Sequence, residues 1–353
     1  MDHSRALRAL KSLAWVDWKR RKTMMRREAW VAIVVACAAL AAAWALPGSL
    51  NTDSHALVLW TWAMMLVRIL YFHLGLLLLV IGTLAAWQRQ FRMAAACLPV
   101  VVLTVLLPYL NFGPRGSPLA AGPVLRVISA NLLMINHNTQ PILDEIAQSD
   151  ADIVFLQEYT DHWDAAFKTR FEKIYPYRII YPQEDSFGSA IYSRYRFIGP
   201  PSIDSDMGKW SVAQLSAIVD VQGIPVECRN IHLMPPRKMD YTIDHLDELR
   251  DFVHALSQVK DKPVIVASDF NFTGSTLQAQ AIQATGFRDA FVEAGTGHGT
   301  TWPVNGILRF LPGIRLDHIF LSPSLSCRTI STGNGYGSAH RPLVAEIIIR
   351  QAK

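Results

Sequence analysis

The pattern of apolar positions divides the chain at about residue 123. Three long apolar segments precede this point, at 30–46, 56–87 and 93–110. A membrane-crossing helix needs about 20 apolar residues, and each segment is near or above that length. A buried helix of a soluble protein is the alternative for any one segment, but three in succession favour a membrane. We therefore predict three transmembrane helices within 29–110.

After residue 123 the apolar segments become short and resemble strands. "VLRVISANLL" is β-rich, "ADIVFLQE" has the pattern of a buried strand ending on a carboxylate, and "TQPILDEIAQSD" has helical spacing. A helix is expected over about 240–258. Further strands are expected at "YRIIYP", "GSAIYSRY", "VAQLSAIVDV", "IPVECRNIHL", "KPVIVASDFN", "RLDHIFLSP", "CRTISTG" and "PLVAEIIIR". Many strands with few helices between them predict an α+β sandwich of paired sheets with helices outside.

Composition supports this division into a membrane part and a globular part. Of the 353 residues, 51% are hydrophobic and 18% are charged, with a mean hydropathy of +0.18. This is too apolar for an ordinary soluble protein and too polar for one that lies wholly in a membrane. We expect a basic tail over 1–28, a membrane region over 29–110, a Gly/Pro/Ser-rich linker over 111–123 and a globular domain over 124–353.

The location of the charge predicts the orientation in the membrane. Residues 1–28 hold nine Lys/Arg against three acidic residues, an excess of six, whereas the whole chain has a net charge of +5. The link 88–92 carries two arginines and the link 47–55 carries no Lys or Arg. Because basic links stay inside, we expect a cytoplasmic N-terminus and a final domain in the periplasm or extracellular space. A multi-pass protein of a bacterial inner membrane fits this pattern.

Two alternatives stay open in the N-terminal region. The first apolar segment could be a signal peptide, since Ala43-Trp44-Ala45 fits a small-x-small cleavage site. The tail could be a disordered basic segment or an amphipathic helix on the anionic inner leaflet. The final domain lies outside in either case, and the basicity of the tail gives no reason to expect a nucleic-acid partner.

Arg68 and His73 are ionisable residues in the second apolar segment. Such groups at membrane depth are functional candidates. Arg68 could instead lie near the outer interface, with its charged end reaching the headgroups.

Cys228 and Cys327 lie on expected strands of the outer domain. In an oxidising compartment they could form a disulfide. The alternative is that both thiols are simply buried.

Polar residues recur at the ends of the expected strands. A carboxylate next to the interior is costly unless it is paired or bound to a cation. Any one of these residues could be a cap or a turn, but together they predict a site at one rim of the sandwich. They are Asn131, Glu158, His232, Asp269, Asn271, Asp317 and His340.

The motifs around these residues resemble those of the endonuclease/exonuclease/phosphatase superfamily. "SANL", "FLQE", "GSAIYSR", "NIHL", "SDFN", "RLDHIF" and "SAHRPLVA" occur in the order of that superfamily, over about residues 124–350. Each motif is short, and the ordered set carries the resemblance. It implies a DNase I-like four-layer α/β/β/α sandwich and a phosphoesterase that depends on a divalent metal, usually Mg²⁺, with Mn²⁺ as the alternative.

The resemblance also implies a role for each residue. Glu158 with Asn131 would hold the metal, because hard cations take oxygen ligands. Asp269 would orient or deprotonate the attacking water, and Asn271 would hold that water or a phosphate oxygen.

On the phosphate side, the resemblance implies that His340 contacts the ester. Asp317 would fix the tautomer of His340 and favour its charged form, and His232 would be a second phosphate contact. The candidate substrate-binding residues are Arg315, Trp302 and Arg341, with simple packing as the alternative for Trp302.

Ala339 departs from the superfamily pattern, in which an aspartate usually precedes the last histidine. Alanine offers neither a metal ligand nor a partner for water. Three interpretations stay open: a working enzyme with one metal, an engineered or natural substitution that impairs turnover and keeps binding, and a pseudoenzyme that binds a phosphate ligand.

The topology suggests the substrate, which the motifs do not identify. A domain tethered outside by a short linker stays close to the outer leaflet, so we expect a phospholipid or lipid-linked phosphate ester. The globular domain lacks a run of Lys/Arg interleaved with aromatics, so a nuclease is the less favoured alternative. The segment "HLMPPRKMDY" is either a lip loop that touches the membrane or a plain surface loop.

Overall fold

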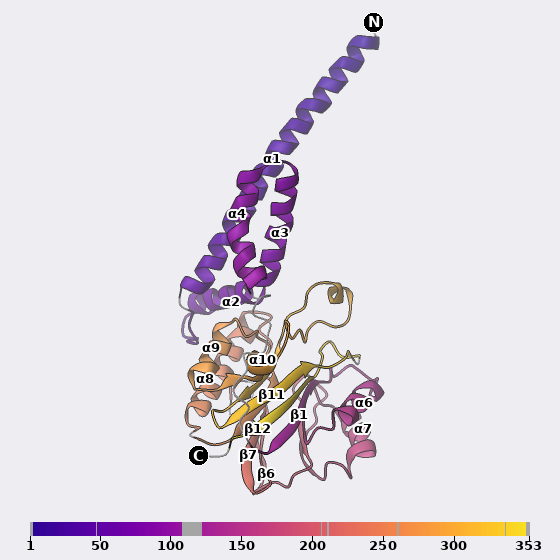
Figure 1. Ribbon diagram of the computed structural model, residues 1–353, viewed down its shortest axis with the longest axis vertical. Helices are drawn as coiled ribbons and strands as arrows, with labels where there is room; N and C mark the ends of the chain where they lie inside the picture. The colour runs from indigo at the N-terminus through magenta and orange to yellow at the C-terminus, as the bar shows by residue number, and fades with distance from the viewer. Residues whose placement is uncertain are drawn as a thin grey trace. The chain divides into compact units, whose positions relative to one another are not determined.

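The computed structural model describes residues 3–46, 48–107, 122–205, 207–209, 212–259, 261–335 and 337–350, with side chains from Thr23 onward (Figure 1). The chain forms two compact units. The helical unit comprises Met1–Pro47 and Leu70–Leu110, and the sandwich unit comprises Gly48–Ile69 and Asn111–Lys353. The predicted linker 111–123 lies outside the described residues except for its last two.

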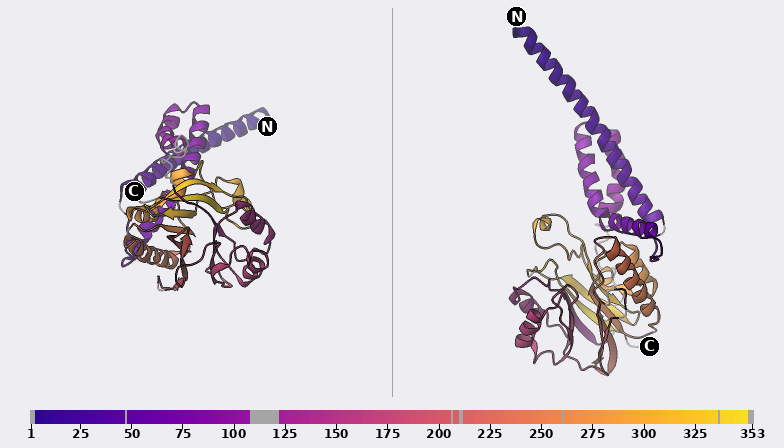
Figure 2. Two further views of the ribbon diagram at one scale, coloured as in Figure 1. Left: turned by 60° about the horizontal axis from the view of Figure 1, so that its bottom comes forward. Right: turned by 180° about the vertical axis from the view of Figure 1, so that it is seen from behind.

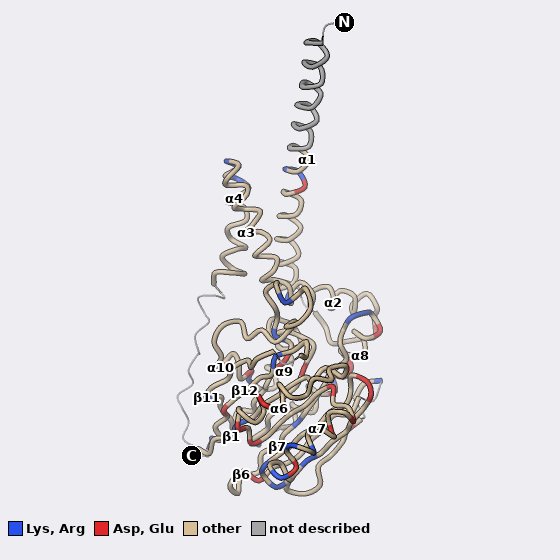
Figure 3. The backbone as a smooth tube through the Cα atoms, turned by 90° about the vertical axis from the view of Figure 1, so that its right-hand side faces the viewer, with Lys and Arg blue, Asp and Glu red and all other residues tan. Residues whose placement is uncertain are grey.

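The helical unit contains α1 (His3–Ala45), α3 (Tyr71–Trp87) and α4 (Phe91–Val101), which continues as the π-helix η1 (Val102–Leu106). A small apolar core joins these helices through Ile33, Leu78 and Cys97. The described charges of this unit are Arg26, Arg27 and Glu28, within α1, and Arg89 and Arg92, near the start of α4, whereas Figure 3 shows none along α3.

Among the residues that the structure describes, one helical segment, Thr23–Ala45, is by length and composition long and apolar enough to cross a membrane. The second predicted span is broken, since α2 (His55–Ile69) and α3 pass the same test only as a pair bent by 59°. The third, Phe91–Leu106, is shorter and contains Pro99, which removes a helical hydrogen bond. The prediction of three transmembrane helices is therefore not confirmed.

The sandwich unit is built on two six-stranded sheets. The first has the order β11-β12-β1-β2-β4-β3 and the second the order β5-β6-β7-β8-β10-β9. The strands of the first sheet are β1 (Val124–Asn131), β2 (Ile153–Gln157), β3 (Tyr177–Tyr181), β4 (Ser189–Ser193), β11 (Leu325–Thr332) and β12 (Leu343–Ile349). Those of the second are β5 (Ser202–Asp204), β6 (Gln214–Val221), β7 (Ile224–Asn230), β8 (Val264–Asp269), β9 (Arg288–Asp289) and β10 (Asp317–Leu321).

Helices cover the outer face of each sheet (Figures 1 and 2). α6 (Gln140–Ser149) and α7 (Asp161–Phe171) share an apolar core with the first sheet. α8 (Met239–Ser257) and α9 (Leu277–Ala284) share another with the second sheet, while the short α10 (Ala290–Ala294) packs on β11. A third core fills the space between the sheets. The predicted α/β/β/α layering is confirmed, although the sequence patterns did not single out α7, α9 or α10.

Strand directions bring the polar strand ends to one rim. β1 and β2 are parallel, and β12 runs antiparallel to β1, so the start of β12 meets the ends of the other two. In the second sheet, β7 and β8 are parallel and β10 is antiparallel to β8. Asp317, the first residue of β10, is therefore paired with Asp269, the last residue of β8.

A buried amide pair joins the two sheets close to this rim. Gln157 Nε2 donates to Asn230 Oδ1 over 2.7 Å, and Asn230 Nδ2 donates to the carbonyl oxygens of Leu156 and Ala190. Both amide side chains are fully buried. Because buried polar groups are stable only when paired, this contact fixes how the sheets approach each other.

Two cysteines of the sandwich unit and Arg68 of α2 are buried. Cys228 and Cys327 are free, buried thiols, so the disulfide alternative is wrong. Arg68 is buried on α2, and its Nη1 donates to Gln280 Oε1 of α9 over 3.1 Å. Arg68 therefore contributes to attaching α2 within the sandwich unit. His73 lies in α3 of the helical unit.

Glu248 provides a stability test of this packing. It is fully buried on α8, and its Oε2 accepts a hydrogen bond from the Met234 backbone N–H. Burial, with Asp244 and Asp247 nearby, raises the pKa of Glu248 to about 8. The folded state therefore holds a proton between about pH 4.5 and 8 that the unfolded state releases, and the stabilisation from that proton is lost as pH rises through this window.

We predict that Glu248→Gln stabilises the sandwich unit at pH 9 by a few kcal/mol relative to wild type, with a much smaller difference at pH 5. Denaturant unfolding of the full chain in detergent at both pH values measures this. Glu172→Gln is the matched control, because the Glu172 side chain is 53% exposed. Equal effects of Glu248→Gln at the two pH values would contradict the assignment.

Candidate active site

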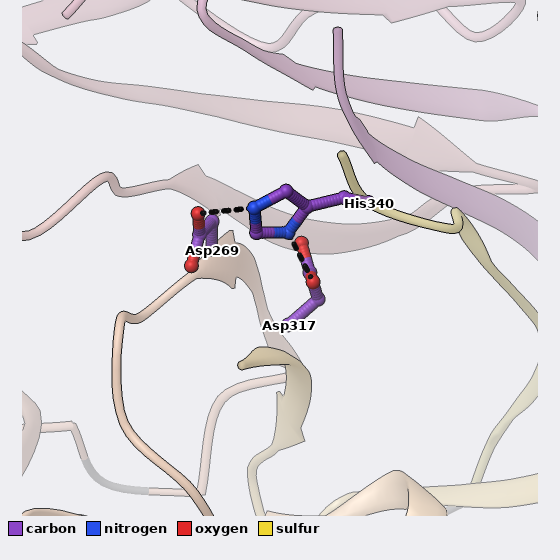
Figure 4. Close-up of side chains that lie close together, drawn as sticks. All are labelled: Asp269, Asp317 and His340. Carbon is purple, nitrogen blue, oxygen red and sulfur yellow. Dashed lines mark hydrogen bonds and ion pairs between the residues drawn. The ribbon is translucent and has the colours of Figure 1, made fainter. Parts of the chain in front are cut away.

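Two aspartates and a histidine converge at the rim (Figure 4). Asp269 and Asp317 lie opposite each other on β8 and β10, and His340 lies in the segment that leads into β12. His340 Nδ1 is 2.8 Å from Asp317 Oδ2, and its Nε2 is 3.6 Å from Asp269 Oδ2. All three side chains are buried, and one ligand atom from each lies within 4.8 Å of the others. This group is named the rim cluster below.

Asn131 connects the rim cluster to Glu158. Its Nδ2 donates to Glu158 Oε1 over 2.9 Å and to Asp269 Oδ2 over 3.1 Å. Its Oδ1 accepts from the Leu133 backbone N–H. The first sheet thus adds a third carboxylate to the site, with the donor end of the Asn131 amide turned toward the acids. The predicted role of Asn131 as an oxygen ligand stays a prediction, and it requires the amide to turn over.

Two site residues have a backbone conformation that L-residues rarely adopt. Glu158 follows β2 with φ 55°, and Asn271 follows β8 with φ 56°. Asn271 donates its backbone N–H to Asp269 Oδ1 over 3.0 Å and its Nδ2 to the Leu233 carbonyl oxygen. Non-glycine residues with positive φ cost energy and cluster at functional sites. The two turns place the side chains of Glu158 and Asn271 at the rim instead of extending the strands.

The rim cluster makes the His340 imidazole unusually basic. Burial disfavours a charged imidazole, but the charges of Asp317, Asp269 and Glu158 outweigh that cost and raise the pKa of His340 to about 9. When no cation is bound to these carboxylates, His340 is therefore protonated at neutral pH. The second imidazole, that of His232, lies with Nε2 3.7 Å from Asp269 Oδ2.

The donor set fits a divalent cation. Asn131 contacts Glu158 and Asp269, and His340 contacts Asp269 and Asp317, so three carboxylates lie close together. Negative charges held this close need a compensating cation. Asp317 Oδ1 is buried and has no hydrogen-bond partner among the described residues. Carboxylate and amide oxygens are the ligands that Mg²⁺ and Mn²⁺ prefer.

Of the three predicted substrate-binding residues, two lie next to the rim and one has its side chain elsewhere. Arg341 has an exposed side chain beside His340, and the Trp302 backbone pairs with Ile314 next to the rim. The guanidinium of Arg315 lies away from the rim cluster, with Nη1 2.8 Å from Asp289 Oδ2 and 2.7 Å from His318 Nδ1. The substrate roles of these arginines stay predictions, and Arg315 has a protein partner that its sequence context did not reveal.

Ala339 lies half-buried at the rim, and its carbonyl oxygen accepts a hydrogen bond from the Val304 backbone N–H over 3.0 Å. The side chain offers no polar atom to the cluster. The position is thus integrated into the backbone of the site while the carboxylate expected there is missing.

A model of the endonuclease/exonuclease/phosphatase family matches residues 128–340, which include the rim cluster, Asn131 and Glu158. The chain belongs to this family. Members of the family are phosphoesterases that use divalent metals. No curated protein is similar enough in sequence to be matched.

Solved structures of the family share the fold of the sandwich unit. A humanized D. rerio TDP2 is 19% identical, with a TM-score of 0.55, over 64% of this chain and 98% of that one. A family protein from Beutenbergia cavernae is 18% identical, with a TM-score of 0.54, over 65% and 72% of the two chains. The human Nocturnin catalytic domain is 18% identical, with a TM-score of 0.50, over 65% and 96%. At these identities the likeness shows the fold alone.

The strand-end pattern did not identify the residues that support the site, because these residues do not lie at strand ends. Thr301 Oγ1 accepts from the backbone N–H groups of Leu316 and Asp317 and so fixes the start of β10. Ser338 Oγ donates to the Asn131 carbonyl oxygen over 2.7 Å and accepts from the His340 N–H. Ser338 lies within the "SAHRP" motif, which could have identified it, whereas nothing in the sequence singles out Thr301.

We predict that Asp317→Asn lowers the rate of phosphodiester hydrolysis about 100-fold or more, because His340 loses its orienting carboxylate and part of its positive charge. Turnover of a soluble diester with Mg²⁺, together with circular dichroism, measures activity and folding separately. Asp289→Asn is the control, since Asp289 pairs with His318 in a second buried Asp–His contact outside the rim cluster. Comparable losses in both variants at equal folding would contradict a special role for Asp317.

Proposed function

We propose that this protein is a membrane-tethered, metal-dependent phosphodiesterase or phosphatase that acts outside the cytoplasm on a phospholipid or lipid-linked phosphate ester. The observation that supports it most is the rim cluster of Asp269, Asp317 and His340, joined through Asn131 to Glu158. This arrangement combines acid/base groups, a positive charge and a cation site, which phosphoester hydrolysis requires.

Each residue has a task in this reaction. A phosphodiester repels an incoming hydroxide, and the positively charged His340 reduces that repulsion by donating a hydrogen bond to a phosphate oxygen. Asp317 holds the His340 ring in place through the 2.8 Å contact. Asp269 accepts the proton of the attacking water, and Asn271, fixed to Asp269 and Leu233, orients that water. We assign a second phosphate contact to His232, whose Nε2 lies 3.7 Å from Asp269 Oδ2.

Mg²⁺, or Mn²⁺ in its place, would be held by Glu158 with Asn131 and would neutralise charge on the phosphate. The Ala339 position removes one carboxylate from this neighbourhood. Glu158, Asp269, Asp317 and His340 remain together, which favours a working enzyme with one metal. An impaired enzyme that retains binding, or a pseudoenzyme, is the alternative that activity measurements decide.

The membrane location and the lipid substrate rest on the sequence pattern. The apolar segment Thr23–Ala45 follows a basic tail, and a cytoplasmic N-terminus would place the sandwich unit on the other side, which in bacteria is the periplasm. A hydrolase held there meets lipid headgroups at high local concentration.

A nuclease is the second candidate. One structure with the same fold is D. rerio TDP2 complexed with single-strand DNA product, and another is a Neisseria 3′ phosphatase bound to a product DNA hairpin. Against this alternative, the basic excess of the chain lies in the tail over residues 1–28, which leaves the remainder close to neutral.

We predict hydrolysis that requires Mg²⁺ or Mn²⁺ and stops in EDTA, with phospholipid or lipid-linked phosphate esters turned over faster than single-stranded DNA. Purified full-length protein in detergent micelles, assayed for released phosphate or headgroup, measures this. Faster turnover of DNA would favour the nuclease over the lipid hydrolase. No turnover of any ester would favour the pseudoenzyme that binds a phosphate ligand.

We predict that Ala339→Asp raises the rate of Mg²⁺-dependent hydrolysis, because it adds a carboxylate at the rim next to His340. Steady-state kinetics over a range of Mg²⁺ concentrations measure the change. Ala339→Asn is the matched control, since it adds similar volume without the charge. Equal rates in wild type, Ala339→Asp and Ala339→Asn, with Glu158→Ala also unchanged, would contradict metal-dependent catalysis at this site.

A further inference from the structure

An exposed apolar tip projects from the rim of the sandwich unit. It is formed by η2 (Ile307–Phe310) and Leu311. Ile307 is 83% exposed, Phe310 is 75% exposed and Leu311 is 59% exposed. Soluble surfaces rarely gather large apolar side chains in this way unless they contact a membrane or a partner. This segment is named the apolar tip below.

Backbone contacts attach the base of the apolar tip to the active site. Trp302 and Ile314 exchange two backbone hydrogen bonds of 2.9 and 2.7 Å. Beside them, the Val304 N–H donates to the Ala339 carbonyl oxygen, and the Arg341 N–H donates to the Thr301 carbonyl oxygen. The base of the apolar tip is therefore hydrogen-bonded to Ala339 and Arg341, the residues on either side of His340.

The second element of this surface is α2, which belongs to the sandwich unit. Its buried face contains Val58, Thr61, Met65 and Arg68, at helical spacing. Polar contacts hold that face, since Trp62 Nε1 donates to the Pro236 carbonyl oxygen over 2.9 Å and Gln278 Nε2 lies 2.8 Å from Met65 Sδ. α2 is thus built into the sandwich unit as a docked helix.

The other face of α2 is also apolar, which a helix at a water-exposed surface does not need. Leu59 is 49% exposed and Leu66 is 37% exposed. The chain continues directly from α2 into the apolar helix α3, and α1 with its candidate span precedes it in sequence. A helix with one face on protein and the other face apolar, between such segments, suits the plane of a membrane interface.

The apolar tip and α2 lie at the same end of the sandwich unit, in Figure 1 and again in the reverse view of Figure 2. Basic side chains accompany both. The Arg309 guanidinium lies 4.8 Å from the centroid of the Phe310 ring, and Arg237 and Lys238 are exposed in the loop that contacts Trp62. Apolar side chains flanked by basic ones match the acyl boundary and the anionic headgroups of a bilayer.

We propose that the apolar tip and the outer face of α2 together form a membrane-docking surface, whose occupant is the interface of a bilayer that contains anionic lipid. The proposal deepens the proposed function, because it places the rim that holds His340 at the level of the headgroups. The apolar tip then anchors the sandwich unit to the bilayer, and this anchoring does not depend on the length of the 111–123 linker.

Depth-dependent quenching tests this surface without any need for activity. The full chain, with Cys37 and Cys97 replaced by alanine, is labelled with an environment-sensitive fluorophore at Ile307→Cys and placed in nanodiscs that contain phosphatidylglycerol. Cys228 and Cys327 are buried, and burial raises the pKa of both thiols, so they react slowly with the label.

We expect a blue-shifted emission at position 307 and strong quenching by lipids with a nitroxide near the headgroup end of the acyl chain. The matched control is Ile218→Cys, on β6, which is 40% exposed and should show neither effect. Quenching at position 307 no stronger than at position 218 would overturn the proposal. Blue-shifted emission without lipid quenching would also overturn it, and would indicate a second copy of the chain as the occupant.

An activity experiment separates this surface from the catalytic proposal. In Ile307→Ser/Leu308→Ser, we expect unchanged turnover of a soluble diester and a loss of about tenfold or more on phospholipid vesicles, because two exposed apolar side chains that would enter the bilayer have been replaced by polar ones. Equal losses on both substrates, or none on vesicles, would count against docking. If wild type hydrolyses no lipid at all, the proposed substrate fails, while the quenching result still decides whether the surface docks.

Discussion

Carboxylates that are held together at a buried rim are the constraint on which the rest of this site depends. Asp269 and Asp317 face each other because β8 and β10 are paired in register, and Asn131 brings Glu158 against them from the other sheet. A protein interior does not stabilise such a group by itself. The high pKa of His340, the orientation of the Asn131 amide and the demand for a cation all follow from this concentration of negative charge.

Much of this arrangement could be predicted from the sequence, because strand ends obey simple rules. The predicted catalytic and metal-binding residues lie at or close to the ends of apolar strands, and the directions of those strands bring them to one rim. Side-chain partners are less predictable, because they depend on contacts between distant segments. Arg315 is adjacent to the rim in sequence, yet its guanidinium pairs with Asp289, and the support from Thr301 has no local signal.

The membrane region shows the same contrast between composition and packing. Hydropathy alone treats 56–87 as one span, but Arg68 and Trp62 make contacts within the sandwich unit that a helix in the bilayer core could not make. Those contacts explain why the apolar segment breaks near residue 70 into two helices. The helix before the break, α2, packs one face on the sandwich unit and exposes apolar side chains on the other face. This arrangement is typical of a helix at a membrane interface.

We propose that Glu158 and Asn131, next to His340, hold a divalent cation. An anomalous difference map from crystals of the protein grown with Mn²⁺ tests it most directly. We expect a peak at about 2.0–2.3 Å from a Glu158 carboxylate oxygen, the range of metal–oxygen bonds for such ions. A map with no peak at the rim while Mn²⁺ binds elsewhere, or a peak whose ligands exclude Glu158, would contradict this proposal.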